Sequence, residues 1–379
     1  MTRLLYLVSH PIQYQAPLLR RIAADPDIHL TVLFERMDTA GAYYDPGFGA
    51  EVTWDSDLTA GYAFAAARSL DDVERHLLDA DAFWVHGWDS GLKRRALEMA
   101  RRRGVPALMR GENTIAAMPD GGGLHGILKR AYLRWIFYRC TAFLCIGSDN
   151  RDYYRRHGIA DDRLFAMPYA VDNEAFTELA AAADPTAVRR DLELQPGRPV
   201  VLFAGKFQAR KSPVLLLEAM QRLDRAAAHE PYLLYVGSGE DEGRLRAAAG
   251  DADWVRFLGF RNQAELPALY ALADLFVLPS EREPWGLAVN EAMACGTAVV
   301  ATDECGCAAD LIDDACGRVV PAGVGPPLVE ALTDLLGDAE RLAHMGRAAQ
   351  TRIAVWSYAE DVEGLKAALS YVASLRRPA

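Results

Sequence analysis

Short runs of apolar residues alternate along the whole chain with longer stretches in which apolar residues recur every three or four positions. A nearly continuous apolar run is typical of a strand buried on both faces of a parallel sheet. The longer period is typical of a helix that covers such a sheet. The alternation of the two patterns therefore predicts an α/β protein built from doubly wound parallel sheets.

The pattern occurs in two series separated by a less regular stretch. In the first series we predict strands at 4–9, 29–34, 82–85, 105–109 and 142–146, with helices at 15–24, 92–103 and 124–139. In the second we predict strands at 200–205, 232–236, 254–258, 275–278 and 298–301, with helices at 212–225 and 358–375. Each series is expected to form one Rossmann-like domain.

The stretch between the series contains an alanine-rich segment and the breaker-rich segment Gln-Pro-Gly-Arg-Pro at 195–199. Because proline and glycine interrupt regular structure, we predict a linker at 171–198. The domains are then 1–170, joined by the returning segment 358–379, and 199–357. Two such domains in series predict a cleft at the carboxyl ends of both sheets, with the ligand in that cleft.

Composition narrows the class of protein and of partner. The chain is 51% hydrophobic and 25% charged, which excludes a disordered or coiled-coil protein. Its net charge of −11 disfavours nucleic acid as a partner, because such binding depends on neutralising phosphates. We find no apolar run of about 18 residues and no signal peptide, so we expect a cytoplasmic protein. The six cysteines fit no zinc or disulfide pattern and are expected to be free thiols.

Positive charge is concentrated in one region of this acidic chain. Residues 91–156 contain 14 Lys or Arg against 5 Asp or Glu, with an aromatic and aliphatic cluster at 133–138. One interpretation is peripheral contact with an anionic membrane surface. The other is a pair of ordinary sheet-covering helices with basic outer faces.

The segment Glu-Pro-Trp-Gly-Leu-Ala-Val-Asn-Glu at 283–291 follows an apolar strand and leads into a helix that starts near Gly286. Glu283 and Glu291 therefore flank a strand-to-helix turn. The unpaired N–H groups of the helix terminus can hold an anion, and two carboxylates can accept hydrogen bonds from sugar hydroxyls. The alternative is a helix whose early acidic residues merely favour its dipole.

A second segment, Gly-Lys-Phe-Gln-Ala-Arg-Lys-Ser at 205–212, also follows an apolar strand. We expect Lys206 and Lys211 to converge on one phosphate group as point charges. The alternative is a solvated basic turn. Further glycine turns follow the strands at 232–236 and 254–258.

At this point the region 200–320 resembles the nucleotide-sugar-binding domain of glycosyltransferase family 4, which consists of retaining enzymes of GT-B architecture. The resemblance rests on the two lysines, on VGSGEDEGRL and VRFLGF, and on the phrase ADLFVLPSEREPWGLAVNEAMACGTAVVATDECGCAADLI. It extends over nearly the whole chain and implies two Rossmann-like domains facing across a cleft, with the last helix crossing back to the first domain.

The resemblance also implies roles for individual residues. Lys206 and Lys211 would contact the donor diphosphate, Glu283 the donor sugar, and Glu291 the ribose hydroxyls, while the Gly259 loop would receive the base. With His86, the first three of these are the expected catalytic residues. The implied donor-binding residues are Gly205, Gly237, Gly259, Phe260, Pro284, Trp285, Gly286, Leu287, Ala288 and Glu291.

The amino-terminal half matches the family less closely. His86 ends a predicted strand, where the family places a histidine that faces the donor sugar; a structural histidine is the alternative. The family's glycine-rich loop after the first strand is replaced by Ser-His-Pro-Ile-Gln-Tyr at 9–14, and Tyr169-Ala170 replaces its Asn-Gly hinge. The expected acceptor-side residues are His10, Gln13, Tyr14, Arg110 and Glu112.

Taken together, these features predict a glycosyltransferase that moves a sugar with retention from a nucleotide-diphosphate donor to an acceptor hydroxyl. A UDP-sugar is the first donor expected, and no metal or other cofactor is expected. Two other classes stay open: a GT-B sugar phosphorylase or sugar-phosphate synthase, and a non-catalytic nucleotide-sugar-binding protein.

Overall fold

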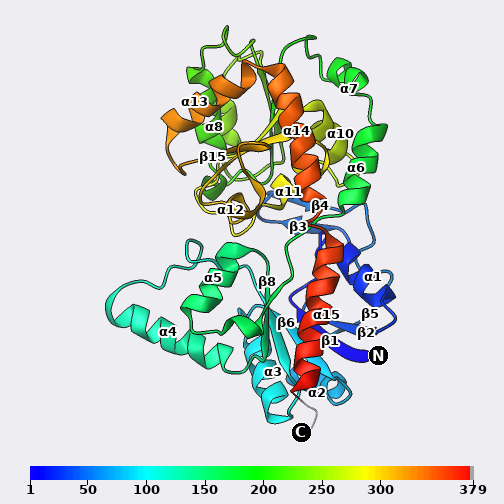
Figure 1. The fold of residues 1–379 in the computed structure, drawn as a ribbon. Helices are drawn as coiled ribbons and strands as arrows, with labels where there is room; N and C mark the ends of the chain where they lie inside the picture. Colours follow the sequence, from blue (N-terminus) through cyan, green and yellow to red (C-terminus); the bar gives the residue numbers. More distant parts are fainter. Residues whose placement is uncertain (376–379) are drawn as a thin grey trace. The chain divides into compact units, whose positions relative to one another are not determined.

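The computed structural model describes residues 1–375, which divide into two compact units (Figure 1). Unit 1 consists of 1–42, 56–169 and the described residues from 358 onward; unit 2 consists of 43–55 and 170–357. Residues 376–379, part of the predicted returning segment, lie outside the described residues. Each unit is built around its own parallel sheet, which confirms the predicted fold class.

In the described part of unit 1 the sheet has seven parallel strands, in the order β5-β2-β1-β6-β7-β8-β9. The order of the strands along the chain reverses between β1 and β6. Ligands of doubly wound sheets bind at such a switch point, beyond the carboxyl ends of the strands. The bounds are β1 (Thr2–Val8), β2 (Ile28–Phe34), β5 (Ala63–Ala66), β6 (Ala82–His86), β7 (Ala107–Arg110), β8 (Ala142–Cys145) and β9 (Leu164–Ala166).

Helices cover this sheet, and its core is formed by apolar residues of β6, β7 and β8 together with α3, α4 and α5. The last helix of the chain, α15, packs against β8, β9 and α1, which confirms the predicted return to the first domain. The helices of unit 1 are α1 (Ala16–Ala24), α2 (Leu70–Leu77), α3 (Gly91–Arg102), α4 (Gly123–Phe137), α5 (Ser148–Arg156), the 3-10 helix η1 (Asp161–Arg163) and α15 (Tyr358–Ser374).

In the described part of unit 2 the main sheet has six parallel strands, in the order β12-β11-β10-β13-β14-β15. This is the Rossmann order, and its switch point lies between β10 and β13. The bounds are β10 (Val200–Ala204), β11 (Tyr232–Val236), β12 (Val255–Gly259), β13 (Leu275–Leu278), β14 (Ala298–Thr302) and β15 (Gly317–Val320).

In the described part of unit 2, strands and helices alternate between β10 and β15, as the apolar periodicity predicts, while two helices precede β10 and two follow β15. The helices of this unit are α6 (Asn173–Ala182), α7 (Pro185–Asp191), the 3-10 helix η2 (Ala209–Lys211), α8 (Pro213–Arg222), α9 (Glu242–Ala249), α10 (Leu266–Leu272), α11 (Leu287–Ala294), α12 (Ala308–Leu311), α13 (Gly325–Leu336) and α14 (Ala339–Ile353).

The segment predicted as a linker, 171–198, differs from that expectation because it folds into α6 and α7 as part of unit 2. The side chains of Asp172 and Asp184 cap the two helices, and alanine is the strongest helix former. Both helices pack against α10, and α6 also packs against α11.

A second departure lies inside the predicted first domain. Residues 43–55 belong to unit 2, where β3 (Tyr43–Asp45) and β4 (Ala50–Val52) form an antiparallel hairpin. The predicted boundary at 170 misses this exchange because the contacts that hold the hairpin come from residues more than 150 positions further along the chain.

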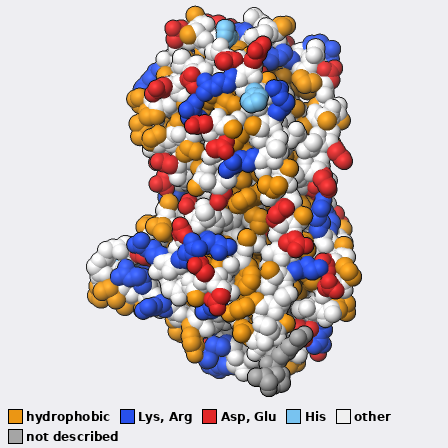
Figure 2. All heavy atoms as spheres, in the orientation of Figure 1, with side chains coloured by type: hydrophobic (Ala, Val, Ile, Leu, Met, Phe, Trp, Pro, Cys, Tyr) orange, Lys and Arg blue, Asp and Glu red, His pale blue; other side chains and the backbone are white. Residues whose placement is uncertain are grey.

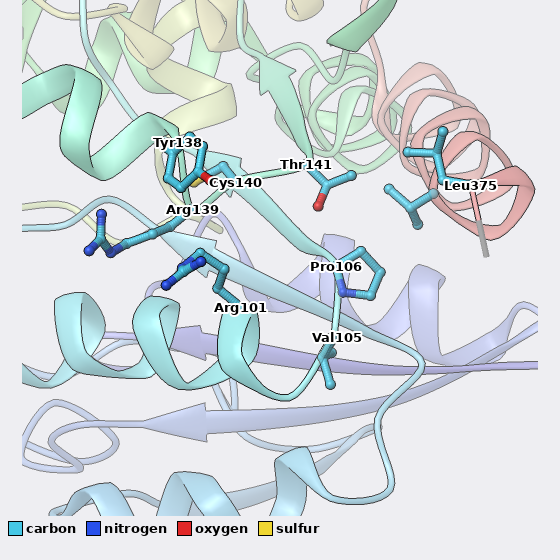
Figure 3. A pocket seen from close by; sticks show the side chains of 10 residues that line it. Arg101, Val105, Pro106, Tyr138, Arg139, Cys140, Thr141 and Leu375 are labelled. Atoms are coloured by element: carbon cyan, nitrogen blue, oxygen red, sulfur yellow. The ribbon is translucent and has the colours of Figure 1, made fainter.

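Unit 1 also contains a pocket of about 260 Å³, lined by residues that precede β7 and β8 and by the end of α15 (Figure 3). Val105 and Pro106 come before β7, and Thr141 comes before β8. The pocket therefore lies at the amino ends of these strands, the edge opposite to the one at which doubly wound sheets bind their ligands.

Candidate functional site

Charged side chains meet at the switch point of unit 2. Lys211, in η2 after β10, donates from Nζ to Glu283 Oε2 at 2.5 Å, and Arg210 Nη1 lies 3.3 Å from the same oxygen. Because β10 and β13 are neighbours in the sheet, the loops that follow them bring these residues together across the switch point. The side chains of Lys211 and Glu283 are 13% and 10% exposed, so the pair still reaches solvent.

Backbone pairing fixes the position of Glu283. Its N–H donates to the carbonyl of Glu304, and its carbonyl accepts from the N–H of Gly306 at 2.9 Å. The loop after β13 is thus paired with the loop after β14. The chain then turns through Gly286, whose φ of +105° lies in the region that favours glycine, and enters α11.

Glu291 lies in the second turn of α11, where Tyr270 donates a hydrogen bond to its Oε2 at 2.7 Å. Burial raises the pKa of Glu291 to about 7, although the hydrogen bonds from Tyr270 and Gln263 oppose the shift. Ionised, this carboxyl group can accept hydrogen bonds from two vicinal hydroxyls.

Trp285 departs from the donor-contact role implied for it. Its ring is buried and stacks on Trp356 with a centroid distance of 5.5 Å, and its Nε1 donates to Asn290 Oδ1 at 2.9 Å. The indole therefore supports the turn from inside. Of the remaining residues of this implied donor segment, Gly286, Leu287 and Ala288 have backbone N–H groups at the start of α11. Pro284 precedes them in the turn and has no backbone N–H.

The three predicted glycine turns lie together at the carboxyl ends of β10, β11 and β12. Gly205 N–H donates to Val236 O at 2.9 Å, and Gly237 N–H donates to Gly259 O at 2.8 Å. A Cβ at Gly237 would come within 2.0 Å of Gly205 O, so no larger residue fits there. Because the turns contain glycine, backbone atoms rather than side chains line this edge of the sheet, next to the charged residues of the loops after β10 and β13.

Lys206, in the first of these turns, is held by a residue that sequence reasoning missed. Its Nζ lies 2.8 and 2.9 Å from the two carboxylate oxygens of Asp45, in the hairpin 43–55, and 4.8 Å from the centre of the Phe48 ring. Each of the two predicted lysines thus has a carboxylate partner of its own: Asp45 for Lys206 and Glu283 for Lys211.

At the switch point of unit 1 the polar side chains form a hydrogen-bonded chain. The hydroxyl oxygen of Tyr169 lies 3.2 Å from His86 Nε2, and the same hydroxyl donates to Glu112 Oε1 at 2.7 Å. The hydroxyl of Tyr14 donates to the same carboxylate oxygen at 3.1 Å. Since the single proton of Tyr169 goes to Glu112, His86 donates from Nε2 to the tyrosine oxygen. Tyr169 had been noted only as a departure from the family hinge.

His86 is neutral at physiological pH. Burial of the ring and the positive charge of Arg110 lower the pKa of His86 to about 3. Its Nδ1 is buried and has no hydrogen-bond partner within residues 1–375. In this arrangement His86 can accept or donate a hydrogen bond but cannot serve as a stored positive charge.

Arg110, predicted as an acceptor-side residue, is instead a buried support. Its guanidinium donates to the carbonyls of Met167 and Pro168 at 2.9 Å each and to Asp361 Oδ1, in α15, at 2.7 Å. The residue is 1% exposed. A buried charge needs a charged partner and hydrogen bonds, and these are provided by other parts of unit 1.

The remaining acceptor-side candidates come from the loop after β1. Tyr14 reaches Glu112, whereas His10 Nδ1 lies 2.9 Å from the hydroxyl of Ser9 and 3.5 Å from Arg36 Nη2. Gln13 is partly exposed in the same loop. Among residues 1–375, no three His, Cys, Asp or Glu side chains gather in a way that would hold a metal ion.

Comparison with known proteins gives matches of two kinds. Residues 184–352 match the family model of the glycosyl transferases group 1. The D-inositol 3-phosphate glycosyltransferase of Nocardia farcinica is 34% identical over 228 residues, which are 58% of this chain and 50% of that protein. A GDP-mannose-dependent monoacylated alpha-(1-6)-phosphatidylinositol monomannoside mannosyltransferase of Corynebacterium glutamicum is 34% identical over 201 residues, 51% of this chain and 52% of that protein. The chain spans about half the length of these curated relatives.

Solved structures match over the entire length. Sucrose-phosphate synthase of Thermosynechococcus elongatus superposes with a TM-score of 0.74 at 17% identity, covering 99% of this chain and 100% of that chain. The HepE protein of Anabaena in complex with UDP superposes with a TM-score of 0.75 at 15% identity, covering 98% of this chain and 100% of that chain. These structures share the fold, which confirms the predicted GT-B architecture. The match to the family model confirms the predicted resemblance over residues 184–352.

Proposed function

We propose that this chain, in which residues 184–352 form a group 1 glycosyl transferase domain, transfers a sugar from a nucleoside diphosphate to an acceptor hydroxyl. The contact between Lys211 and Glu283 across the switch point of unit 2 carries the proposal. In this proposal Lys211 stabilises the leaving diphosphate, and Glu283 beside it orients the sugar.

The chemistry assigned to unit 2 is stabilisation of negative charge. As the bond to the sugar breaks, the departing diphosphate gains charge, while the sugar acquires oxocarbenium character. Lys211, Lys206 and the amino terminus of α11 are the groups that stabilise the diphosphate, and Glu283 accepts hydrogen bonds from the sugar. We propose that these groups act without a metal and that the configuration of the sugar is retained.

The base of the donor remains to be tested between two candidates. UDP is the first, as expected from the sequence, and a solved structure of the same fold contains UDP. GDP is the second, because one relative is named as GDP-mannose-dependent. In either case Glu291 would accept hydrogen bonds from the ribose.

Unit 1 is proposed to bind the acceptor. Tyr14 and Tyr169 both donate to one oxygen of Glu112, so the other oxygen can accept from an acceptor hydroxyl. A hydroxyl-rich acceptor suits such a site, and several relatives are named for transfer to inositol phosphate.

The first experiment is a thermal-shift panel with UDP, GDP, dTDP, ADP and CMP in EDTA. A ligand at about one hundred times its dissociation constant adds about 2.7 kcal/mol to the free energy of unfolding. We expect one nucleoside diphosphate to raise Tm, and its sugars then to release nucleoside diphosphate in proportion to the glycoside formed. A phosphorylase would consume inorganic phosphate instead, and binding without turnover would indicate a binding protein.

A separate observation favours a lipid partner. Helix α4 has two apolar faces: Leu133, Ile136 and Phe137 are buried in the core, while the opposite face is exposed. Orange and blue side chains lie side by side on the surface of this helix (Figure 2). The exposed face consists of Leu124, Ile127, Leu128, Tyr132, Trp135 and Tyr138, the last directly after the helix.

We propose that this face of α4 docks on an anionic membrane surface, because it lies in the region 91–156 with its excess of positive charge. Within residues 1–375 no helix has the length and apolar character needed to cross a bilayer. We expect flotation with phosphatidylglycerol vesicles but not with phosphatidylcholine vesicles. Replacing Leu124, Ile127 and Leu128 by Ser should abolish flotation, whereas Leu179→Ser, an exposed leucine of unit 2, should not. Concentration-dependent dimerisation through this face would contradict the proposal.

A further inference from the structure

The hairpin 43–55 contacts the loops that follow three neighbouring strands of unit 2. Asp45 holds Lys206 after β10, Ser238 Oγ after β11 donates to Phe48 O at 2.7 Å, and Asn262 after β12 donates to Thr53 O at 2.9 Å. The loops after β10, β11 and β12 lie on one side of the switch point of unit 2, where we propose that the nucleotide binds.

The contact with Lys206 is the polar centre of this docking. The carboxylate of Asp45 faces Lys206 Nζ with both oxygens and also accepts from the N–H groups of Gly47 at 2.7 Å and Phe48 at 3.1 Å. Burial opposes ionisation, but Lys206 and these N–H groups outweigh it and lower the pKa of Asp45, so the carboxyl group is ionised. Asp45 thus provides Lys206 with the kind of anionic partner that a phosphate would be.

The hairpin also covers the place proposed for the base. Phe260 directly follows Gly259. Its ring makes T-shaped contacts with the rings of Phe48 and Trp54, at centroid distances of 5.1 Å and 5.7 Å. Asp55 Oδ2 accepts from the N–H of Ala264 at 2.8 Å. The aromatic contact lies directly against the glycine turn.

We propose that the hairpin 43–55 competes with the donor for the nucleotide site, with the carboxylate of Asp45 occupying on Lys206 the position that the diphosphate takes. This inference rests on the proposed function. Two anions on one ammonium group repel each other, so hairpin docking and nucleotide binding weaken each other by the same factor. The hairpin then limits the affinity for the donor and for the nucleoside diphosphate product alike, and it favours product release.

The test uses Asp45→Asn, which keeps the side-chain oxygen for Gly47 and Phe48 and removes the charge. Titration calorimetry should show that Asp45→Asn binds the wild type's nucleoside diphosphate on the order of tenfold more tightly. This is the effect of removing about one surface charge pair. Glu51→Gln, an exposed carboxylate on β4 of the same hairpin, should leave affinity unchanged. Equal or weaker binding by Asp45→Asn would overturn the proposal.

Hydrogen–deuterium exchange of the wild type provides a second test that needs no variant. Saturating UDP or GDP should speed amide exchange across 43–55. Slower exchange would mean that the hairpin clamps the nucleotide, and unchanged exchange would mean that the nucleotide does not affect the hairpin; either result overturns the proposal. If none of the nucleoside diphosphates binds either the wild type or Asp45→Asn, the proposed function fails and this inference fails with it. If one binds but the hairpin does not respond, only this inference fails.

Discussion

Each unit places its candidate site at the switch point of its own sheet, but the two sites are built from different interactions. In unit 2 the central contacts are ion pairs, Lys206 with Asp45 and Lys211 with Glu283. In unit 1 a chain of hydrogen bonds without an ion pair runs from His86 through Tyr169 to a single carboxylate, Glu112. The same fold thus holds ion pairs at one switch point and a hydrogen-bonded chain at the other, because the loops and not the sheet determine which side chains meet there.

The largest effect is expected from removing the cation of the charged site. Lys211→Ala should lower kcat by about 10²- to 10³-fold, because the departing diphosphate loses a preorganised partner at the point where charge develops. Steady-state assays of nucleoside diphosphate release measure this. Lys366→Ala, a lysine on α15 paired with Asp25 and Asp27, is the matched control and should retain activity. Wild-type kinetics in Lys211→Ala would show that the donor site is assigned wrongly.

A smaller effect is expected from breaking the hydrogen-bonded chain of unit 1. Tyr169→Phe removes one hydroxyl and keeps the ring, so His86 and Glu112 lose the group that links them. We expect KM for the acceptor to rise by about tenfold, the cost of one hydrogen bond to a charged group, with KM for the donor unchanged. Tyr371→Phe on α15 serves as control. A change in donor KM alone would contradict the division of roles between the units.

The smallest effect is a pH dependence confined to unit 2. Because the pKa of Glu291 is raised to about 7, the carboxyl group ionises as the pH rises through neutrality. We expect nucleotide affinity to increase several-fold between about pH 6 and about pH 8, since only the ionised form offers both oxygens to the ribose. Glu291→Gln should bind more weakly and show a flat profile in titration calorimetry. A wild-type profile that is flat over this interval would remove Glu291 from the ribose site.

The raised pKa of Glu291 also makes the free energy of unfolding depend on pH. The pKa in the fold lies above the ordinary value for glutamate, so the folded state holds this proton more tightly than the unfolded chain. The contribution of Glu291 to the free energy of unfolding is therefore greatest at low pH and declines as the pH rises toward 7.

The sequence predicts those features of the fold that depend on the local pattern of apolar and polar residues. The strands are continuous apolar runs, and β11 and β13 begin and end at the predicted residues. The family resemblance assigned both Lys211 and Glu283 to the donor. The two residues meet in the structure because each follows a strand, and neighbouring parallel strands end at the same edge of a sheet.

What the sequence could not provide depends on long-range contacts and on side-chain direction. Asp45 and Lys206 are separated by 161 positions, and no local signal marks the hairpin as part of unit 2. Arg110 is the last residue of β7, one residue beyond the predicted strand. Its partner Asp361 lies 251 positions away, and only the packing shows that the side chain points inward. The segment 171–198 forms α6 and α7 despite its prolines and glycine, because alanine favours helix and Asp172 and Asp184 cap the two helices.

The ion pair between Arg110 and Asp361 joins two parts of unit 1 that are synthesised far apart in time. By the time the ribosome has reached residue 357, every segment of unit 2 has been made, including its early hairpin. Unit 1 still lacks Asp361, and a buried arginine without its counter-ion opposes folding. The half that is translated first is therefore completed last, and it has to persist as an unfinished nascent domain until α15 emerges.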